Sequence, residues 1–299
     1  MKGKSFWLLL VSLVLLGFAG IMLIFAFSMV SEGGGSSIFS GNKVAVVEIK
    51  GGIFDPKDTL DELNRVYDND NLKALILRID SPGGAVSPSQ EIYDAVLRVK
   101  EKKKVVVSMG TVAASGGYYI AVAADKIVAL PGTITGSIGV LMDYTNVQQL
   151  LEFLKVHAEV LKAGKMKDVG SPLRELTPEE RQYLQGILDD MHRQFKAAVA
   201  KGRNIPMEEV DKFADGRVFT GEQAQKMKLV DEIGGQQKAI EVVQAMLGWK
   251  EAPELYYPKK KKAGLIELLA DGQAESRLLK LFYFLREGRA LYWTKGIML

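Results

Sequence analysis

The sequence predicts an α/β protein with a largely parallel sheet, because short apolar strands alternate with amphipathic helices along most of the chain. β-Branched runs typical of buried strands occur at Val44–Ile49, Leu75–Ile79, Val105–Val107 and Ile127–Ala129. Stretches with helical spacing of apolar residues separate these runs. Such alternation implies parallel strands joined by right-handed crossovers, with helices flanking the sheet.

Two helices have N-terminal signals. Ser87-Pro88-Ser89-Gln90 is predicted to be a capping box with proline at the first helical position. Thr177-Pro178-Glu179-Glu180 has the same pattern, ahead of a long helix that we expect to reach about Lys201. Residues 147–160 indicate a further helical run, and Tyr118 to Ala124 resembles a buried helix.

The composition excludes several classes of function. The 299 residues suffice for one large domain, and the 39 basic residues are offset by 36 acidic ones, so we expect no nucleic acid partner. Without cysteine the chain has no disulfide, no thiolate metal site and no cysteine nucleophile. With only two histidines, His157 and His192, we expect no metal site, and nothing indicates a cofactor.

Residues 6–28 are the predicted transmembrane signal anchor. Phe6–Phe27 holds 22 residues without a charge, which as a helix would span ~33 Å. Lys2 and Lys4 precede it, so residues 1–5 are expected in the cytoplasm and the rest of the chain on the extracytoplasmic side. A cleaved signal peptide is the alternative, but its apolar core is usually shorter and followed by a clear cleavage site.

Composition divides the remainder into three parts. Residues 29–42 are rich in glycine and serine and predict a flexible tether, and residues 43–250 carry the α/β pattern. Residues 251–299 form a basic amphipathic tail that contains Lys259–Lys262. The tail is either a helix packed on a neighbour, with solvated lysines, or an interfacial helix on anionic lipid.

Two glycine-rich turns follow predicted strands, where sites form in open α/β sheets. The first is Asp80-Ser-Pro-Gly-Gly84, and the second is Ala113-Ala-Ser115-Gly116-Gly. At such a strand-to-helix turn Ser115 would expose its hydroxyl, and the N–H groups of Gly84 and Gly116 would supply two donors to an oxyanion. The competing interpretation is two ordinary tight turns, with the serine capping a helix.

A serine nucleophile needs a base. His157 lies in the predicted helical run and His192 in mid-helix, so both are expected to be surface or packing residues. A lysine is the remaining common option, but its ordinary pKa of ~10.4 requires desolvation or a neighbouring cation before it can act at neutral pH. Lys162, Lys165 and Lys167 are candidates that spacing alone does not separate.

Taken in order, the motifs resemble the short form of bacterial signal peptide peptidase A. They are Asp80-Ser-Pro-Gly-Gly, Ala-Ala-Ser115-Gly-Gly-Tyr-Tyr, Ala-Ala-Asp-Lys126-Ile, Thr135-Gly-Ser137-Ile-Gly-Val, Asp215-Gly-Arg-Val-Phe-Thr-Gly221 and Leu229-Val-Asp-Glu-Ile-Gly234. The match spans roughly Val44 to Ala245. It implies a Clp/crotonase-like fold and an endopeptidase of the bacterial inner membrane, facing the periplasm, that degrades remnant signal peptides and other short hydrophobic peptides.

The resemblance also implies a role for each site residue. Ser115 is the nucleophile, and a Gly-x-x-Lys pattern selects Lys167 as the general base of a Ser-Lys dyad. Ser137 is expected to hydrogen-bond that lysine and orient it. Family members of this form assemble into homo-oligomeric rings in which adjacent subunits contribute the serine and the lysine. The family's C-terminal tail can occupy neighbouring active sites.

Two other functions remain open. A crotonase-like acyl-CoA enzyme also uses two backbone N–H groups for an oxyanion, but it needs a carboxylate base in the pocket and has no use for a membrane span. A membrane-tethered scaffold with a decayed peptidase site is the second, although the intact serine, lysine and glycines disfavour it.

Overall fold

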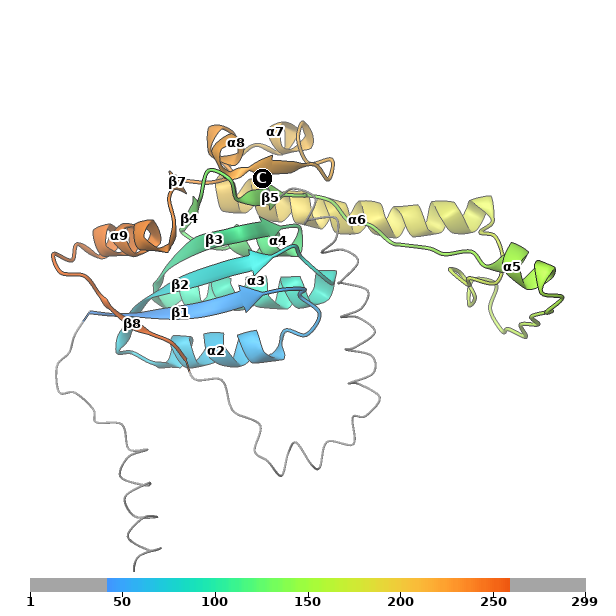
Figure 1. Ribbon diagram of the computed structural model, residues 1–299, viewed down its shortest axis with the longest axis horizontal. Coiled ribbons are helices and arrows are strands. Elements are labelled where there is room, and N and C mark those ends of the chain that lie inside the picture. The colour runs from blue at the N-terminus through green and yellow to red at the C-terminus, as the bar shows by residue number, and fades with distance from the viewer. Residues whose placement is uncertain (1–41, 259–299) are drawn as a thin grey trace, which may run out of the picture.

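An eight-stranded sheet organises residues 42–258, which are the part of the chain that the computed structural model describes (Figure 1). The strand order is β6-β5-β3-β2-β1-β8, and β4 lies beside β3 and β7 off this path. All pairs are parallel except β5–β6, so the predicted largely parallel α/β sheet is confirmed. The strands are β1 Lys43–Lys50, β2 Leu72–Ser81, β3 Lys104–Ala114, β4 Lys126–Ala129, β5 Ile134–Gly136, β6 Val218–Thr220, β7 Glu232–Ile233 and β8 Glu254–Tyr256.

Helices cover both faces of the central strands. One face packs on α2, α3, α4 and the end of α6, and the other packs on α9 (Figure 1). Alternate residues of one strand therefore enter different cores, as Ala45 and Val47 do on one side and Val44 and Val46 on the other. The helices are α2 Lys57–Asp68, α3 Val86–Lys102, α4 Gly116–Ala121, α5 Gln148–Phe153, α6 Pro178–Arg203, α7 Met207–Asp211, α8 Gly221–Lys226 and α9 Gln236–Leu247.

The central strands are longer than their apolar runs. β3 continues to Ala114 because its second half pairs with β5, at Val112↔Ile134 and Ala114↔Gly136. Where β2 and β3 change register, an Asp80 carboxylate oxygen accepts the Val112 N–H at 3.1 Å. A polar side chain thus replaces a backbone partner, and β3 reaches the edge of the sheet without a break.

One predicted helix start is wrong and the other is confirmed. Helix α3 begins at Val86, after Ala85, which has no side-chain cap. The Ala85 N–H donates to the Ile53 carbonyl at 2.8 Å and so holds the residue before the helix extended. At Thr177, by contrast, the expected capping box with Glu180 is present, with proline in the first turn of α6.

The helical run predicted at 147–160 is largely absent. Only α5 forms, and none of its residues is buried, so no tertiary contact extends it. Lys155 has a φ of 56°, which ends any continuation. His157 is therefore not helical; it lies exposed beyond α5.

Residues 141–177, here called the arm, project away from the sheet together with the start of α6 (Figure 1). The 26-residue α6, ~39 Å long, runs from the arm back to the core, where Phe195 and Val199 are buried. The arm has a network of polar contacts but few buried apolar groups. Its exposed large apolar side chains are Leu141, Met142, Leu150, Phe153, Leu154, Val156, Val160 and Leu161.

The predicted anchor at 6–28, most of the tether at 29–42 and most of the tail at 251–299 lie outside the described residues. Among helices within residues 42–258, none combines the length and apolar character needed to cross a bilayer. Strand β8 pairs in parallel with the start of β1, so residues 254–256 join the edge of the sheet.

Asp231 ties α6 to the sheet. Its carboxylate pairs with the Arg203 guanidinium at 2.9 Å and the Lys126 ammonium at 3.1 Å, and it accepts the Ile127 N–H at 2.8 Å. The Arg203 side chain is only 7% exposed. Burial alone would raise the pKa of Asp231, but Arg203, the Ile127 N–H and Lys126 together outweigh burial and hold the pKa below its ordinary value.

We predict that Asp231→Asn destabilises the fold at pH 7 by about 2–4 kcal/mol, because it leaves a buried guanidinium without its counter-charge. The folded pKa lies below the unfolded value of about 4, so this stabilisation is present above that pH and is lost as pH falls through the folded pKa. Urea unfolding at pH 7 and near pH 3 measures both effects. Glu232→Gln, at a more exposed neighbouring carboxylate, is the control; a deficit equally large at both pH values contradicts the prediction.

Candidate active site

Ser115 occupies a sharp turn between β3 and α4. Its φ of 51° and ψ of −122° are unusual for a residue with a side chain, and such a conformation costs roughly 1–3 kcal/mol. The Ser115 N–H donates to the Gly136 carbonyl at 2.9 Å, and its carbonyl accepts the Tyr119 N–H at 2.8 Å. A strained serine between strand and helix is the backbone arrangement that exposes the nucleophile in many hydrolases.

The turn of Gly83 and Gly84 lies against Ser115. A Cβ on Gly83, which has a φ of 110°, would come within 2.7 Å of the Ser115 Cβ, so only glycine fits there. The amide nitrogen of Gly84 lies 3.4 Å from the place that a Cβ of Gly116 would take. The structure thus brings together the two glycines that the sequence predicts as an oxyanion hole.

The Gly84 N–H points away from Ile53, the residue that is bridged to this turn. The bridge between Ile53 and this turn uses the Gly83 carbonyl and the Ala85 N–H, so the Gly84 N–H points to the other side, toward Gly116. Within residues 42–258, neither the Gly84 nor the Gly116 amide is engaged in a backbone hydrogen bond. The Gly116 amide at the start of α4 and the Gly84 amide from the loop before α3 are thus two donors that can stabilise negative charge.

Ser81 holds this turn in place, a role that the sequence did not reveal. Its side chain is fully buried, and its Oγ accepts the Gly83 N–H at 3.1 Å. A Cβ on Gly117 would meet the Ser81 carbonyl at 3.0 Å, so α4 also packs closely on it. The serine between Asp80 and Pro82 would have been the signal, since serine often hydrogen-bonds the backbone two residues on.

Ser137 lies beside the Ser115 turn. It directly follows Gly136, the residue that pairs with Ala114, and it too has a positive φ, of 52°. Its N–H donates to the Arg217 carbonyl at 2.9 Å. His192 of α6 contacts the next carbonyl, that of Ile138, at 3.1 Å, so this histidine packs on the loop that carries Ser137.

An apolar pocket opens at these groups, with a cavity volume of about 30 Å³. Sequence patterns did not single out its apolar side chains, although Met191 and Phe195 stand four residues apart on one face of a helix. No histidine, cysteine or acidic cluster suited to a metal ion occurs in the described part of the chain. The pocket is lined by Gly84, Val86, Ser89, Ser115, Gly116, Tyr119, Gly139, Val140, Met191 and Phe195.

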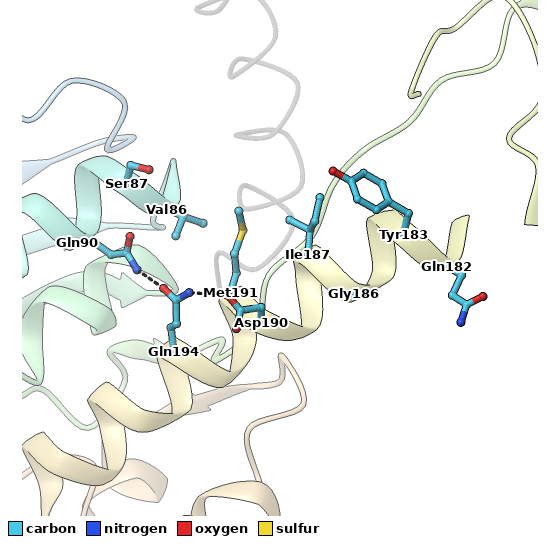
Figure 2. A pocket seen from close by; sticks show the side chains of 10 residues that line it. All are labelled: Val86, Ser87, Gln90, Gln182, Tyr183, Gly186, Ile187, Asp190, Met191 and Gln194. Carbon is cyan, nitrogen blue, oxygen red and sulfur yellow. Dashed lines mark hydrogen bonds between the residues drawn. The ribbon is translucent and has the colours of Figure 1, made fainter. Parts of the chain in front are cut away.

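A longer groove of about 600 Å³ continues from the pocket between α3 and α6, and Figure 2 shows its lining. Val86 and Met191 belong to both hollows. Across the groove Gln90 donates to Gln194 at 2.9 Å, and Gln194 donates to Asp190 at 2.8 Å (Figure 2). The groove therefore has polar side chains in its lining, next to a smaller and mainly apolar pocket.

Lys167 lies in the arm and does not reach Ser115 of its own chain. It is exposed and absent from the lining of the pocket. The arm meets the start of α6, and Phe195 lies ~26 Å further along that helix (Figure 1). Within residues 42–258 of one chain, Ser115 and Lys167 therefore lie in separate parts of the structure.

The three candidate lysines differ in their contacts. Lys162 pairs with Asp168, and Lys165 pairs with Glu179. Lys167 makes no ion pair with any residue in the range 42–258. Lys162 and Lys165 are thus held by carboxylates of their own chain, whereas the Lys167 side chain is left available for a contact outside its own chain.

Comparisons with known proteins agree with this geometry. Residues 98–250 match Peptidase family S49, and residues 56–135 match Clp protease, in agreement with the predicted Clp-like fold. The chain is 46% identical over 208 residues to a provisionally named protease of Synechocystis sp., covering 69% of this chain and 75% of that protein.

Two further relatives have more specific names. A provisionally named signal peptide peptidase SppA of Enterococcus faecium is 33% identical over 71% of this chain and 59% of its own length. The chloroplastic serine protease SPPA of Arabidopsis thaliana is 35% identical over 70% of this chain and 30% of its own length. This chain therefore belongs to peptidase family S49 and is a protease similar to signal peptide peptidase A.

Proposed function

We propose that this protease is a serine-type endopeptidase with Ser115 as nucleophile and Lys167 of a neighbouring copy as general base. The observation that carries the proposal is the strained Ser115 turn packed against Gly83, with the Gly84 and Gly116 amides beside it. A backbone conformation of this cost persists where it serves a function. The name of the Arabidopsis relative, a serine protease, supports the same assignment.

The chemistry follows from these groups. The Ser115 Oγ attacks the scissile carbonyl while its proton passes to the neutral Lys167 Nζ, and the two glycine amides bind the resulting oxyanion. Collapse of the tetrahedral intermediate expels the amine, which takes the proton from the lysine and leaves an acyl-serine. Water then attacks the acyl-serine ester while its proton passes to the lysine. The second tetrahedral intermediate expels the Ser115 Oγ, which takes the proton back from the lysine, and the acid product is released. We assign to Ser137, which lies beside the nucleophile, the role of orienting the lysine.

Assembly supplies the missing base. In a single chain the arm keeps Lys167 away from the pocket, and its side chain is exposed. Apolar side chains of the arm, such as Phe153 at 82% and Leu161 at 98% exposure, are suited to burial against a second copy. Burial of the arm in a homo-oligomeric ring would desolvate the lysine and favour its neutral form.

The substrates we propose are remnant signal peptides and other short hydrophobic peptides. The small pocket lined by Val86, Val140 and Met191 suits a small or aliphatic side chain next to the scissile bond. The predicted anchor at 6–28 would hold the domain at the periplasmic face of the bacterial inner membrane, where such peptides are released. The name of the Enterococcus relative supports this substrate class.

The pocket disfavours an acyl-CoA enzyme. That chemistry needs a carboxylate base, and no aspartate or glutamate is among the described residues that line the Ser115 pocket. Fluorophosphonate labelling distinguishes a peptidase from a catalytically inactive scaffold. The reagent labels an activated serine and leaves a decayed site unlabelled.

We predict that Ser115→Ala lowers kcat on a fluorogenic peptide ester by at least about 10³-fold, because no other group can form the acyl-enzyme. Alanine keeps the Cβ and the backbone conformation, so the thermal unfolding midpoint should change little. Fluorophosphonate labelling of the assembled protein should disappear in the same variant. Retention of wild-type turnover would remove Ser115 from the mechanism.

We also predict that Lys167→Met abolishes turnover whereas Lys165→Met, two residues away, stays within about two-fold of wild type. Co-produced Ser115→Ala and Lys167→Met chains should recover about a quarter of wild-type activity, because one site in four pairs an intact serine with an intact lysine of its neighbour. Each variant alone should remain inactive in the same peptide-ester assay. No recovery in a mixed oligomer shown by light scattering to be assembled would rule out a shared site.

A further inference from the structure

Arg174 stands at the centre of a charged network in the arm. Its Nε donates to an Asp168 carboxylate oxygen at 2.8 Å, and its Nη1 donates to a Glu180 carboxylate oxygen, also at 2.8 Å. The two carboxylate side chains are only 12% and 6% exposed. One guanidinium thus bridges two shielded carboxylates, which a planar, forked group can do and a lysine ammonium cannot do as well.

One end of this network fixes the turn that carries Lys167. Asp168 is the next residue in the chain, and it is also paired with Lys162. Its carbonyl accepts the Ser171 N–H at 3.0 Å, and the Lys167 N–H donates to the Gly164 carbonyl at 3.1 Å. Arg174 therefore holds the residue adjacent to the proposed base, inside a hydrogen-bonded turn.

The other end fixes the start of α6. The Glu180 carboxylate accepts the Thr177 N–H at 2.9 Å, as the second half of the capping box. Hydrogen bonds from Arg174 lower the pKa of Glu180 to about 2, and hydrogen bonds from Arg174 and Lys162 lower the pKa of Asp168. Both carboxylates are thus ionised at any working pH, and the network persists.

Few apolar contacts could take over this task. No residue of α5 is buried, and the large side chains of the arm are exposed. Without Arg174, moreover, Asp168 would keep only one cationic partner, beside the proposed base. The turn of Lys167 would then lose its link through the guanidinium to Glu180 and the start of α6.

We propose that Arg174 is a positioning residue that locks the Lys167 turn onto α6 and so presents the lysine to Ser115 of a neighbouring copy. The inference rests on the proposed function and extends it to a residue that contacts neither substrate nor nucleophile. Small displacements of a catalytic group sharply lower the rate, because the reacting atoms must meet within bonding reach.

Arg174→Met tests the proposal by steady-state kinetics on a peptide ester. We expect kcat to fall at least about 10-fold, with KM within about two-fold, because Arg174 positions the general base and is proposed to make no contact with substrate. Arg174→Lys should recover part of kcat, since it restores charge but not the fork. Lys165→Met, which removes an exposed ion pair from the same turn, is the matched control. An unchanged kcat in Arg174→Met overturns the proposal.

Mixed oligomers separate a positioning role from general instability. Arg174→Met co-produced with Ser115→Ala should regain activity, because an intact serine can then meet an intact lysine turn on the neighbouring chain. With Lys167→Met it should not, because both chains then carry a damaged lysine turn. Recovery with Lys167→Met, or failure with both partners, overturns the role of Arg174. The Ser115→Ala and Lys167→Met pair tests the shared site independently, so its failure refutes the proposed function instead.

Discussion

The backbone of Ser115 is the constraint on which the site depends. A residue with a side chain is held at positive φ where β3 gives way to α4, and three neighbours enforce it. The Gly136 carbonyl takes its N–H, Gly83 packs on its Cβ, and Ser81 fixes the turn of Gly83. Gly136 ends β5, whereas Ser81 ends β2 and Gly83 lies just beyond it, so the serine is positioned only when β2, β3 and β5 are paired. Pairing of these strands and formation of the candidate site are therefore coupled.

Helix α6 connects this site with a second functional element. Near its C-terminal half, Met191 and Phe195 line the pocket, and at its N-terminus Glu180 anchors the turn of Lys167 through Arg174. A continuous helix keeps these ends about two dozen ångströms apart within one chain. Under the proposed mechanism, such a chain contributes its serine to one site and its lysine to the site of a neighbour. The exposed apolar surface of the arm fits such an assembly.

Much of the fold was predictable because its signals are local. Buried strands such as Leu75–Ile79 are continuous apolar runs, and the Thr177 capping box lies within four residues. The sequence patterns mispredicted helices where contacts between residues far apart in the chain determine whether and where a helix forms. Helix α3 starts at Val86 because Ile53 holds the residue before it, and 147–160 has helical periodicity but no surface to pack against.

The candidate site was predictable to a similar extent. Two glycine-rich turns after predicted strands indicated Ser115, Gly84 and Gly116, because sites form at the carboxyl ends of strands in open α/β sheets, although ordinary tight turns have the same composition. Only resemblance to a family distinguished Lys167, whereas the structure adds that Lys162 and Lys165 are held by carboxylates. Arg174 could not have been found from sequence, because a charged residue in an irregular segment has no periodicity to reveal its partners.

The positive φ of Ser115 also bears on how this sequence can evolve. Glycine is the residue that this backbone geometry favours, so drift toward greater thermodynamic stability would remove the hydroxyl first. Under the proposed mechanism, serine is retained at this position for its chemistry, at a cost in folding free energy. In a descendant that has lost its enzymatic role, Ser115 should therefore be among the first residues to be replaced.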